Sequence, residues 1–205
     1  MTGRVVVATR NAGKLRELAP LFRAAGLEVL DLAAAGRPIA SNDEEAIEVH
    51  ATFAENAAAK ARYFHRELGV ACVADDSGLE VAALGGRPGV RSRRWAADEG
   101  VAGGDETSAN NACLVRAMRS VADRRARFVC AAAYCGDGGE SVATGAVAGE
   151  ITAEPRGSSG FGYDPYFFVP ALGKTLAEAS LEEKQRVSHR AAAVRELIAQ
   201  IRGSD

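Results

Sequence analysis

The 205-residue chain has no excess of basic residues, and this absence excludes one class of function. Its 25 lysines and arginines are outnumbered by 27 aspartates and glutamates, which gives a formal net charge of −2. Proteins that grip a nucleic-acid backbone usually carry a basic surplus, because cations must neutralise the phosphates. The composition therefore predicts that nucleic acid is not a partner.

Long apolar runs are also missing. No uninterrupted run approaches the roughly 20 residues that a membrane-spanning helix needs. The first residues lead directly into the strand-like Val5–Ala8, with no charged and apolar leader of the secretory type. We therefore expect a soluble protein of the cytoplasm that has no membrane partner.

The four cysteines and three histidines do not have the spacing of a zinc site. No two cysteines form a CxxC pair; they stand at Cys72, Cys113, Cys130 and Cys135. We expect these thiols to be small buried hydrophobic side chains in a reducing compartment.

The residues that are present fit one globular domain over residues 1–205. The chain is 47% hydrophobic and 25% charged, which excludes general disorder. Apolar and β-branched runs predict strands at 5–8, 27–32, 70–74, 128–134, 141–151 and 166–169. Helical spacing of apolar residues predicts helices at about 15–25, 52–68 and 107–121, and from 188 onwards. This alternation predicts an α/β fold.

Local signals refine this pattern. Pro20 lies inside the first helical pattern and predicts a kink or an early end, because proline removes a backbone donor and crowds the preceding turn. Residues 33–50 are acidic and resemble a loop. The glycine-rich 136–139 predicts a hairpin turn, and Ser180 with Glu183 has the spacing of a capping box.

The most informative segment is the acid pair at Asp75 and Asp76, which comes directly after the apolar run Val70–Ala74 and is followed by Ser77. Buried charge is unfavourable unless a partner or a metal compensates it. We therefore expect the pair to follow the strand and to lie at the lip of the sheet, where open α/β folds bind ligands.

A strand, the loop Thr9–Lys14 and a helix form an arrangement that can bind phosphate. Backbone N–H groups at a helix start point toward an anion, and the helix dipole favours negative charge there. Lys14 would add a cation. An ordinary strand-to-helix turn is the alternative, since the sequence has no P-loop spacing and Leu15 stands where a P-loop has a hydroxyl.

Two further segments carry polar groups at a suggestive spacing. Asn56 and Lys60 are four residues apart and share a helix face, and acidic side chains precede them; a solvated face is the alternative. The loop Gly157–Pro165 combines glycines, which let a ligand approach the backbone, with aromatic rings that can stack on a base. A tight turn with core aromatics would explain that loop equally well.

The order of these motifs resembles the inosine/xanthosine triphosphate pyrophosphatase family, whose members remove non-standard purine nucleotides. The blocks run from Val5 to Arg190 in the family's order: ATRNAGK, FAENAAAK, ADDSGLEVAALGGRPGVRS, GSSGFGYDPYF and EEK followed by SHR. The resemblance implies an elongated central mixed sheet, two lobes with an active-site cleft between them, and a homodimer. It also implies Mg²⁺-dependent hydrolysis of ITP, dITP or XTP at the α–β phosphate bond, giving the monophosphate and pyrophosphate.

The resemblance also implies roles for individual residues. Asp76 would be the catalytic base and, with Glu48, a metal ligand. The substrate would be bound by Thr9, Arg10, Asn11, Ala12, Gly13, Lys14, Lys60, Ser77, Phe161, Gly162, Tyr163, Asp164, Lys184, His189 and Arg190. A structural role is the alternative for His189.

One position departs from the family pattern. His50 stands two residues after Glu48, where the family often has glycine. The alignment of this acidic segment is therefore loose, and Glu44 and Glu45 stay open as alternative metal ligands.

Two other functions fit part of the sequence. A pyrophosphatase acting on other nucleotides, such as modified pyrimidines, would share most of these motifs. A non-catalytic nucleotide-binding regulator is disfavoured by the paired acids, since a polyanion binder gains nothing from carboxylates unless a metal intervenes.

Overall fold

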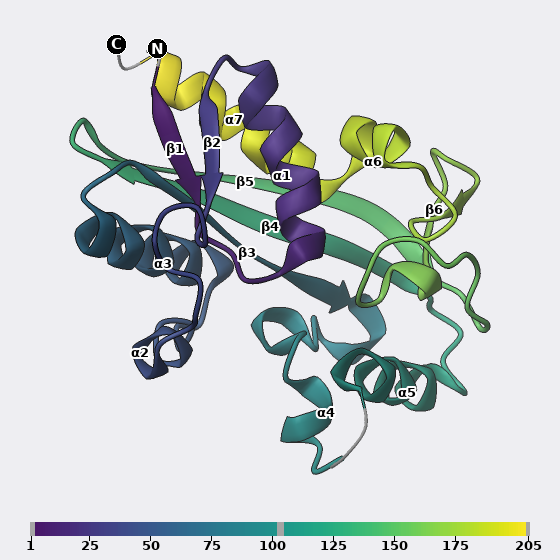
Figure 1. The fold of residues 1–205 in the computed structure, drawn as a ribbon. Helices are drawn as coiled ribbons and strands as arrows, with labels where there is room; N and C mark the ends of the chain where they lie inside the picture. Colours follow the sequence, from purple (N-terminus) through teal and green to yellow (C-terminus); the bar gives the residue numbers. More distant parts are fainter. Residues whose placement is uncertain (1–2, 102–104, 204–205) are drawn as a thin grey trace. The chain divides into compact units, whose positions relative to one another are not determined.

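The computed structural model describes residues 3–101 and 105–203, and it forms a seven-stranded mixed sheet with helices packed on it (Figure 1). The strand order is β2-β1-β3-β4-β5-β6-β7. Strand β1 pairs in parallel with β2 and β3, whereas β6 is antiparallel to β5 and β7. The strands are β1 Arg4–Val7, β2 Glu28–Asp31, β3 Cys72–Val81, β4 Arg125–Gly136, β5 Gly139–Ile151, β6 Phe167–Val169 and β7 Lys174–Thr175. The predicted α/β class with a mixed sheet is confirmed.

Most helices begin where the sequence places a capping side chain. Thr52 accepts a hydrogen bond from the backbone N–H of Glu55 at the start of α3, and Asp105 does the same for Ser108 in α5. The predicted capping box of Ser180 and Glu183 is present before α6. The helices are α1 Ala12–Ala24, α2 Asn42–Glu45, α3 Phe53–Leu68, α4 Trp95–Asp98, α5 Glu106–Met118, α6 Leu181–Val187 and α7 His189–Gly203.

The chain divides into two compact units, each built from separate stretches of sequence. The first unit comprises Met1–Asp76, Cys130–Gly145 and Ser188–Asp205. The second unit comprises Ser77–Val129 and Ala146–Val187. Strands β3, β4 and β5 contribute residues to both. The single domain and the active-site cleft expected from the sequence stay predictions.

The core of the first unit follows the alternation of strand residues. Val5 and Val7 of β1 and Val73 of β3 belong to one apolar cluster with Leu18 and Phe22 of α1. The apolar face of α7 completes this cluster, and Figure 1 shows α1 and α7 on one face of this part of the sheet and α3 on the other. Odd-numbered positions of β3 therefore face α1 and α7, and even-numbered positions face α3.

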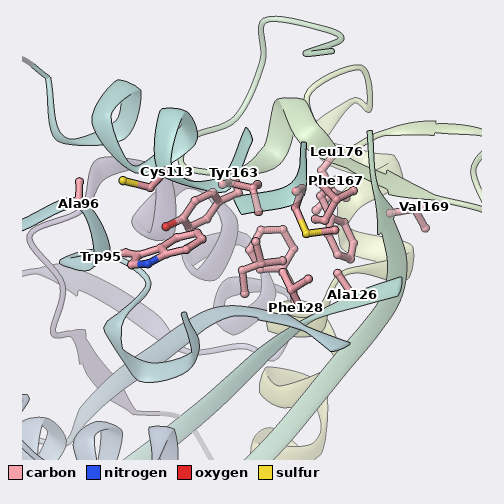
Figure 2. Packing of buried hydrophobic residues seen from close by; sticks show 14 residues of the cluster. Trp95, Ala96, Cys113, Ala126, Phe128, Tyr163, Phe167, Val169 and Leu176 are labelled. Carbon is pink, nitrogen blue, oxygen red and sulfur yellow. The ribbon is translucent and has the colours of Figure 1, made fainter. Parts of the chain in front are cut away.

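The core of the second unit is richer in aromatic rings. Figure 2 shows the Trp95 indole beside the ring of Tyr163, with their centroids 6.5 Å apart. Phe128 and Phe167 form a second tilted pair at 4.5 Å. Such rings bury large areas and attract one another, and here they join α4, β4 and the chain that leads into β6.

Three expectations about the backbone are corrected, in whole or in part. Strand β3 does not end before the acid pair but continues through Asp75 and Asp76 to Val81. The early end expected at Pro20 does not occur, since α1 continues to Ala24 and buried Phe22 packs this last turn into the core; the alternative of a kink stays a prediction. The segment 33–50 is not entirely loop, since Asn42–Glu45 forms a short helix.

The four cysteines are free and buried, as expected. Burial raises the pKa of the Cys72 thiol to about 12, so this sulfur stays protonated. Within the described residues, no helix has both the length and the apolar character that crossing a bilayer requires.

Packing of α7 on β5 gives a stability prediction. A Cβ at Gly145 would lie only 2.5 Å from the backbone nitrogen of Ala193 in α7, so Gly145→Ala forces the helix away. We expect a loss of about 1–3 kcal/mol in the free energy of unfolding, measured by urea denaturation. Gly138→Ala is the matched control, because its Cβ would meet nothing within 4 Å. Equal effects of the two substitutions would contradict the packing.

Candidate functional site

The acid pair of β3 lies beyond the end of the neighbouring strand. Val7, the last residue of β1, pairs with Val73, so Asp75 and Asp76 extend past the point where β1 turns into the loop Thr9–Lys14. Because successive strand residues face opposite sides, Asp75 faces α1 and α7, and Asp76 faces α3. Two adjacent carboxylates thus have separate surroundings.

Asp75 is completely buried and is surrounded by cations. Its Oδ2 lies 3.1 Å from Lys14 Nζ of α1 and accepts a hydrogen bond of 3.1 Å from Arg190 Nε of α7. Burial alone would raise the pKa of this carboxyl, but the charges of Lys14 and Arg190 outweigh it and hold the pKa below its usual range. Asp75 is therefore a fixed negative charge.

Arg190 is itself enclosed by two acids. It is only 3% exposed, and besides Asp75 its guanidinium pairs with Glu17, a residue of α1 that the sequence analysis missed. Lys14 and Glu17 are three residues apart and so lie on one face of α1. This spacing is the sequence feature that could have indicated Glu17. In this structure Arg190 binds carboxylates, and its predicted contact with a base stays a prediction.

Asp76 has the opposite environment. Its Oδ2 accepts a hydrogen bond of 2.9 Å from Asn56 Nδ2, and the residue is 8% exposed. Burial raises the pKa of Asp76, the negative charges of Glu48 and Asp75 add to this, and Lys14 opposes it only in part. A carboxylate with a raised pKa is a better proton acceptor near neutral pH than an ordinary aspartate.

Asn56 also holds the segment that precedes α3. Its Oδ1 accepts the backbone N–H of His50 at 2.9 Å, while its Nδ2 binds Asp76. The His50 side chain is exposed, and only its backbone takes part. The departure from glycine at this position is therefore tolerated, because φ is not positive there.

The acidic segment offers one carboxylate to this group. Glu48 pairs with Lys60; burial would raise its pKa, but Lys60 and Lys14 lower it overall. Glu44 instead binds Arg10, with Oε1 2.7 Å from Nη2. The Glu45 side chain lies outside the described residues. Glu48 is thus the acid that acts electrostatically on Asp76, whereas Glu44 holds the loop.

The loop Thr9–Lys14 is organised by its own side chains. Asn11 Oδ1 accepts the N–H groups of Gly13 and Lys14 at 2.8 and 3.1 Å, and Thr9 Oγ1 accepts the Asn11 N–H at 3.2 Å. These amides already have acceptors, so an anion would have to displace Asn11 to reach them. Ala12 is the first residue of α1, and Lys14 is the cation that this loop directs toward Asp75.

The second unit contains its own buried ion pair. Lys184 Nζ lies 2.6 Å from Asp164 Oδ2, and that oxygen also accepts the N–H of Phe161 at 3.1 Å. Gly160 has φ of +82°, and a Cβ there would overlap both charged groups. The loop, including Gly162, is therefore shaped around Asp164 and Lys184.

The aromatic residues of this loop differ in burial. Tyr163 is 5% exposed in the core, and its hydroxyl donates to the carbonyl of Ser92 at 2.7 Å. Phe161 is only half-buried. Tyr163 is therefore a core residue, as in the alternative interpretation of this loop. Phe161 is the ring that we assign to stacking on a base.

Other residues named from the sequence take these positions. Ser188 is buried and its Oγ accepts the N–H of Ala191, so it caps α7. His189, the first residue of α7, is 4% exposed. Ser77 follows Asp76 in β3 and is half-buried.

Carboxylates are the side chains here that could hold a divalent cation. Within the described residues, no three His, Cys, Asp or Glu side chains form a group that could hold a metal ion. Glu48 and Asp76 nevertheless offer hard oxygen ligands, and the negative charge of Glu48 makes Asp76 harder to ionise, which a cation would relieve. This fits Mg²⁺, which commonly takes one or two carboxylates and completes its shell with phosphate and water.

The opposite environments predict opposite stability effects at pH 7. Asp75→Asn leaves Lys14 and Arg190 short of a buried partner and should lower the free energy of unfolding by about 3–5 kcal/mol. Asp76→Asn keeps an acceptor for Asn56 and removes a poorly stabilised charge, so it should raise stability. Chemical denaturation without metal measures both.

The pH dependence has a definite sign. The pKa of Asp75 is lower in the folded protein than in the unfolded chain, where it is about 3.9. Asp75 therefore contributes fully to the free energy of unfolding above the unfolded-state pKa, and this contribution is lost as the pH falls through the folded-state pKa. Asp75→Asn should therefore flatten the acid limb of the stability curve. If both variants were destabilised alike, the separate environments would be refuted.

The comparisons with known proteins agree with this geometry. The model of the Ham1 family matches residues 5–200. A dITP/XTP pyrophosphatase of Burkholderia pseudomallei is 49% identical over 97% of this chain and 93% of its own length. The Ham1 protein of Staphylococcus aureus superposes with a TM-score of 0.80 at 36% identity, over 98% of this chain and 100% of that one.

A third relative has a solved structure and is named for its activity. The nucleoside-triphosphatase / dITP/XTP pyrophosphatase of Mycobacterium abscessus has a TM-score of 0.69 at 39% identity, over 97% of this chain and 98% of its own. A family match over nearly the whole sequence, relatives near half identity and the shared fold lead to one conclusion. The chain belongs to the Ham1 family.

Proposed function

We propose that this protein hydrolyses non-standard purine nucleoside triphosphates, namely ITP, dITP and XTP, to the monophosphate and pyrophosphate. The observation that carries the proposal is the pair of adjacent carboxylates whose pKa values are displaced in opposite directions beside Lys14 and Lys60. Environments that separate two such values mark acid–base assignments in enzymes. The names of the relatives supply the substrate class.

The cations would bind the triphosphate. Lys14 is 15% exposed and Lys60 is 17% exposed, so each ammonium can reach a ligand while held by an acid. In the proposed complex the phosphate oxygens join these ion pairs. Thr9, Arg10, Asn11, Ala12 and Gly13 would position the same tail, with Asn11 exchanging its own amide contacts for phosphate.

Asp76 would accept the proton of the attacking water. Water oxygen bonds to the α-phosphorus, the α–β bridging bond breaks, and its electron pair leaves with pyrophosphate, while Asp76 takes the water proton. Asn56 keeps the carboxylate oriented, and Asp75 stays ionised and holds Lys14 in place. A positioned base contributes about 10²–10⁴-fold to such rates.

Mg²⁺ is the proposed cofactor, held by Glu48 and Asp76. When bound, it would neutralise phosphate charge as the leaving group develops. The chain's own contribution is to keep Glu48 ionised beside Lys60 and to hold Asp76 near Lys14 with a raised pKa, so that a cation would stabilise the charged form of Asp76.

Base recognition rests on the motif resemblance. We assign it to Phe161–Asp164, Ser77, Lys184, His189 and Arg190. A donor from these side chains would match the 6-carbonyl of hypoxanthine or xanthine. The 6-amino group of adenine would leave two donors facing each other, which buried sites reject strongly. Action in the cytoplasm on the nucleotide pool, and a homodimer, complete the proposal.

One assay tests the function directly. A panel of ITP, dITP, XTP, ATP, GTP and modified pyrimidine triphosphates is scored for release of pyrophosphate or orthophosphate. We expect pyrophosphate from the first three and slow turnover of ATP. Asp76→Asn should reduce kcat by about 10²-fold or more without unfolding the protein. Equal rates on ATP and ITP, or an active Asp76→Asn variant, would refute the proposal.

A second experiment separates the candidate metal ligands. Glu48→Gln should increase the Mg²⁺ concentration needed for half-maximal turnover by about tenfold or more, because it removes one of two protein carboxylates. Glu44→Gln is the matched control, since Glu44 binds Arg10 instead. A larger shift for Glu44→Gln would exchange the two assignments.

A further inference from the structure

A cavity of about 530 Å³ in the second unit contains none of the residues assigned above to the substrate. One wall is a single face of α5, along which the lining residues recur every three or four positions from Ser108 to Arg119. The volume lies within the roughly 300–1,000 Å³ typical of small-molecule sites. The space is large enough for a ligand.

The lining residues outside α5 are mainly apolar. They are Pro155, Pro165 and Tyr166, which come from the chain between β5 and β6. Val115 of α5 completes the apolar part. A flat ring fits such a surface, because bases stack on aromatic side chains with about 1–3 kcal/mol each.

The charge of the cavity has one sign. Arg116 and Arg119 line it at the end of α5, and none of the described lining residues is acidic. Among the described residues neither arginine has an ion-pair partner; the Arg116 guanidinium contacts only the Cys113 sulfur at 3.6 Å. By contrast, Arg93 and Arg125 of the same unit each pair with a carboxylate.

The helix end does not neutralise these cations. The carboxyl end of a helix carries the equivalent of about half a negative charge, whereas the two guanidinium groups carry two positive charges. The remaining positive charge favours an anion. Arginine pairs bind phosphate oxygens with matched, charge-assisted hydrogen bonds.

We propose that this cavity binds a nucleoside monophosphate, with the phosphate on Arg116 and Arg119 and the base against Tyr166. The choice of a nucleoside monophosphate rests on the proposed function, because that reaction releases this phosphate ester. The shape and charge require only a phosphate joined to a flat, largely apolar ring.

The cavity also borders the loop assigned to base recognition. Asn111 lines it, and its Nδ2 donates to the carbonyl of Gly162 at 3.1 Å. Its Oδ1 is buried and accepts no hydrogen bond from the described residues. Pro165 lines the cavity directly after Asp164 in sequence. A ligand here would therefore lie next to the segment that holds Phe161 and Asp164.

Calorimetric titration of the full-length protein with inosine monophosphate tests the site. Arg116→Ala/Arg119→Ala should weaken binding at this site by about tenfold or more, because two charge-assisted contacts are lost. Lys60→Ala, which alters the first unit, should retain it. Arg93→Ala/Arg125→Ala is the matched control and should bind like the wild type, with circular dichroism verifying the fold of each variant.

The probes separate the possible occupants. Inosine should not bind the cavity, and inorganic phosphate should bind more weakly than inosine monophosphate. Equal affinity for phosphate alone, or unchanged nucleotide binding in Arg116→Ala/Arg119→Ala, would overturn the proposal. Loss of self-association in that variant with unchanged nucleotide binding would also overturn it and make the cavity an interface between copies. Binding is measured without turnover, so its failure is distinguishable from failure of the pyrophosphatase assay.

Discussion

The buried charge of Asp75 is the constraint on which the first unit depends. This carboxylate has no exposed side-chain surface, so it must be compensated by protein groups, and it receives Lys14 from α1 and Arg190 from α7. Glu17 then balances the second side of Arg190. Removing any member leaves a buried charge with fewer partners than it needs, and this cost exceeds the net gain from the intact pair. The network therefore determines where α1 and α7 begin relative to β3.

The neighbouring Asp76 shows how one strand serves stability and reactivity together. Its carboxylate is buried with two other acids acting on it, and the side-chain amide of Asn56 donates a hydrogen bond that orients it. That arrangement keeps the charged form less stable than it would be in water. Proteins commonly retain such locally unfavourable groups where chemistry takes place. Asp75, one residue away, stabilises the same strand, so the two effects are separated by geometry and not by distance in sequence.

Much of the architecture could be predicted from periodicity. Short β-branched runs located six of the seven strands, all but the two-residue β7, and helical spacing with capping residues located α3, α5 and α7 within a few residues. The strand through the acid pair could not be predicted, because its stabilising partner Arg190 is 115 residues away in sequence. The rule that charge ends a buried strand fails where distant cations converge.

Some residues of the candidate site could likewise be predicted from local sequence, whereas others could not. Local motifs identified Lys14, Lys60 and Asp76, since strand, loop and helix follow one another in sequence. Glu17 and the dual role of Asn56 emerged only from tertiary contacts. Tyr163 and Phe161 are both aromatic residues of the same glycine-rich loop, yet the Tyr163 hydroxyl donates a hydrogen bond to the Ser92 carbonyl in the core. Neighbouring aromatics in a loop cannot be distinguished until packing is known.

The two-residue repeat of β3 has an evolutionary consequence. Inserting or deleting one residue between Val73 and Asp75 would turn each carboxylate to the opposite face of the sheet. Asp75 would then face α3 and lose its ion pairs, and Asp76 would face α1 and α7. Point substitutions along this strand change single contacts, whereas an odd-length indel inverts the whole arrangement. Lineages descended from this protein should therefore vary in the length of segment 33–50 long before they vary in the length of this strand.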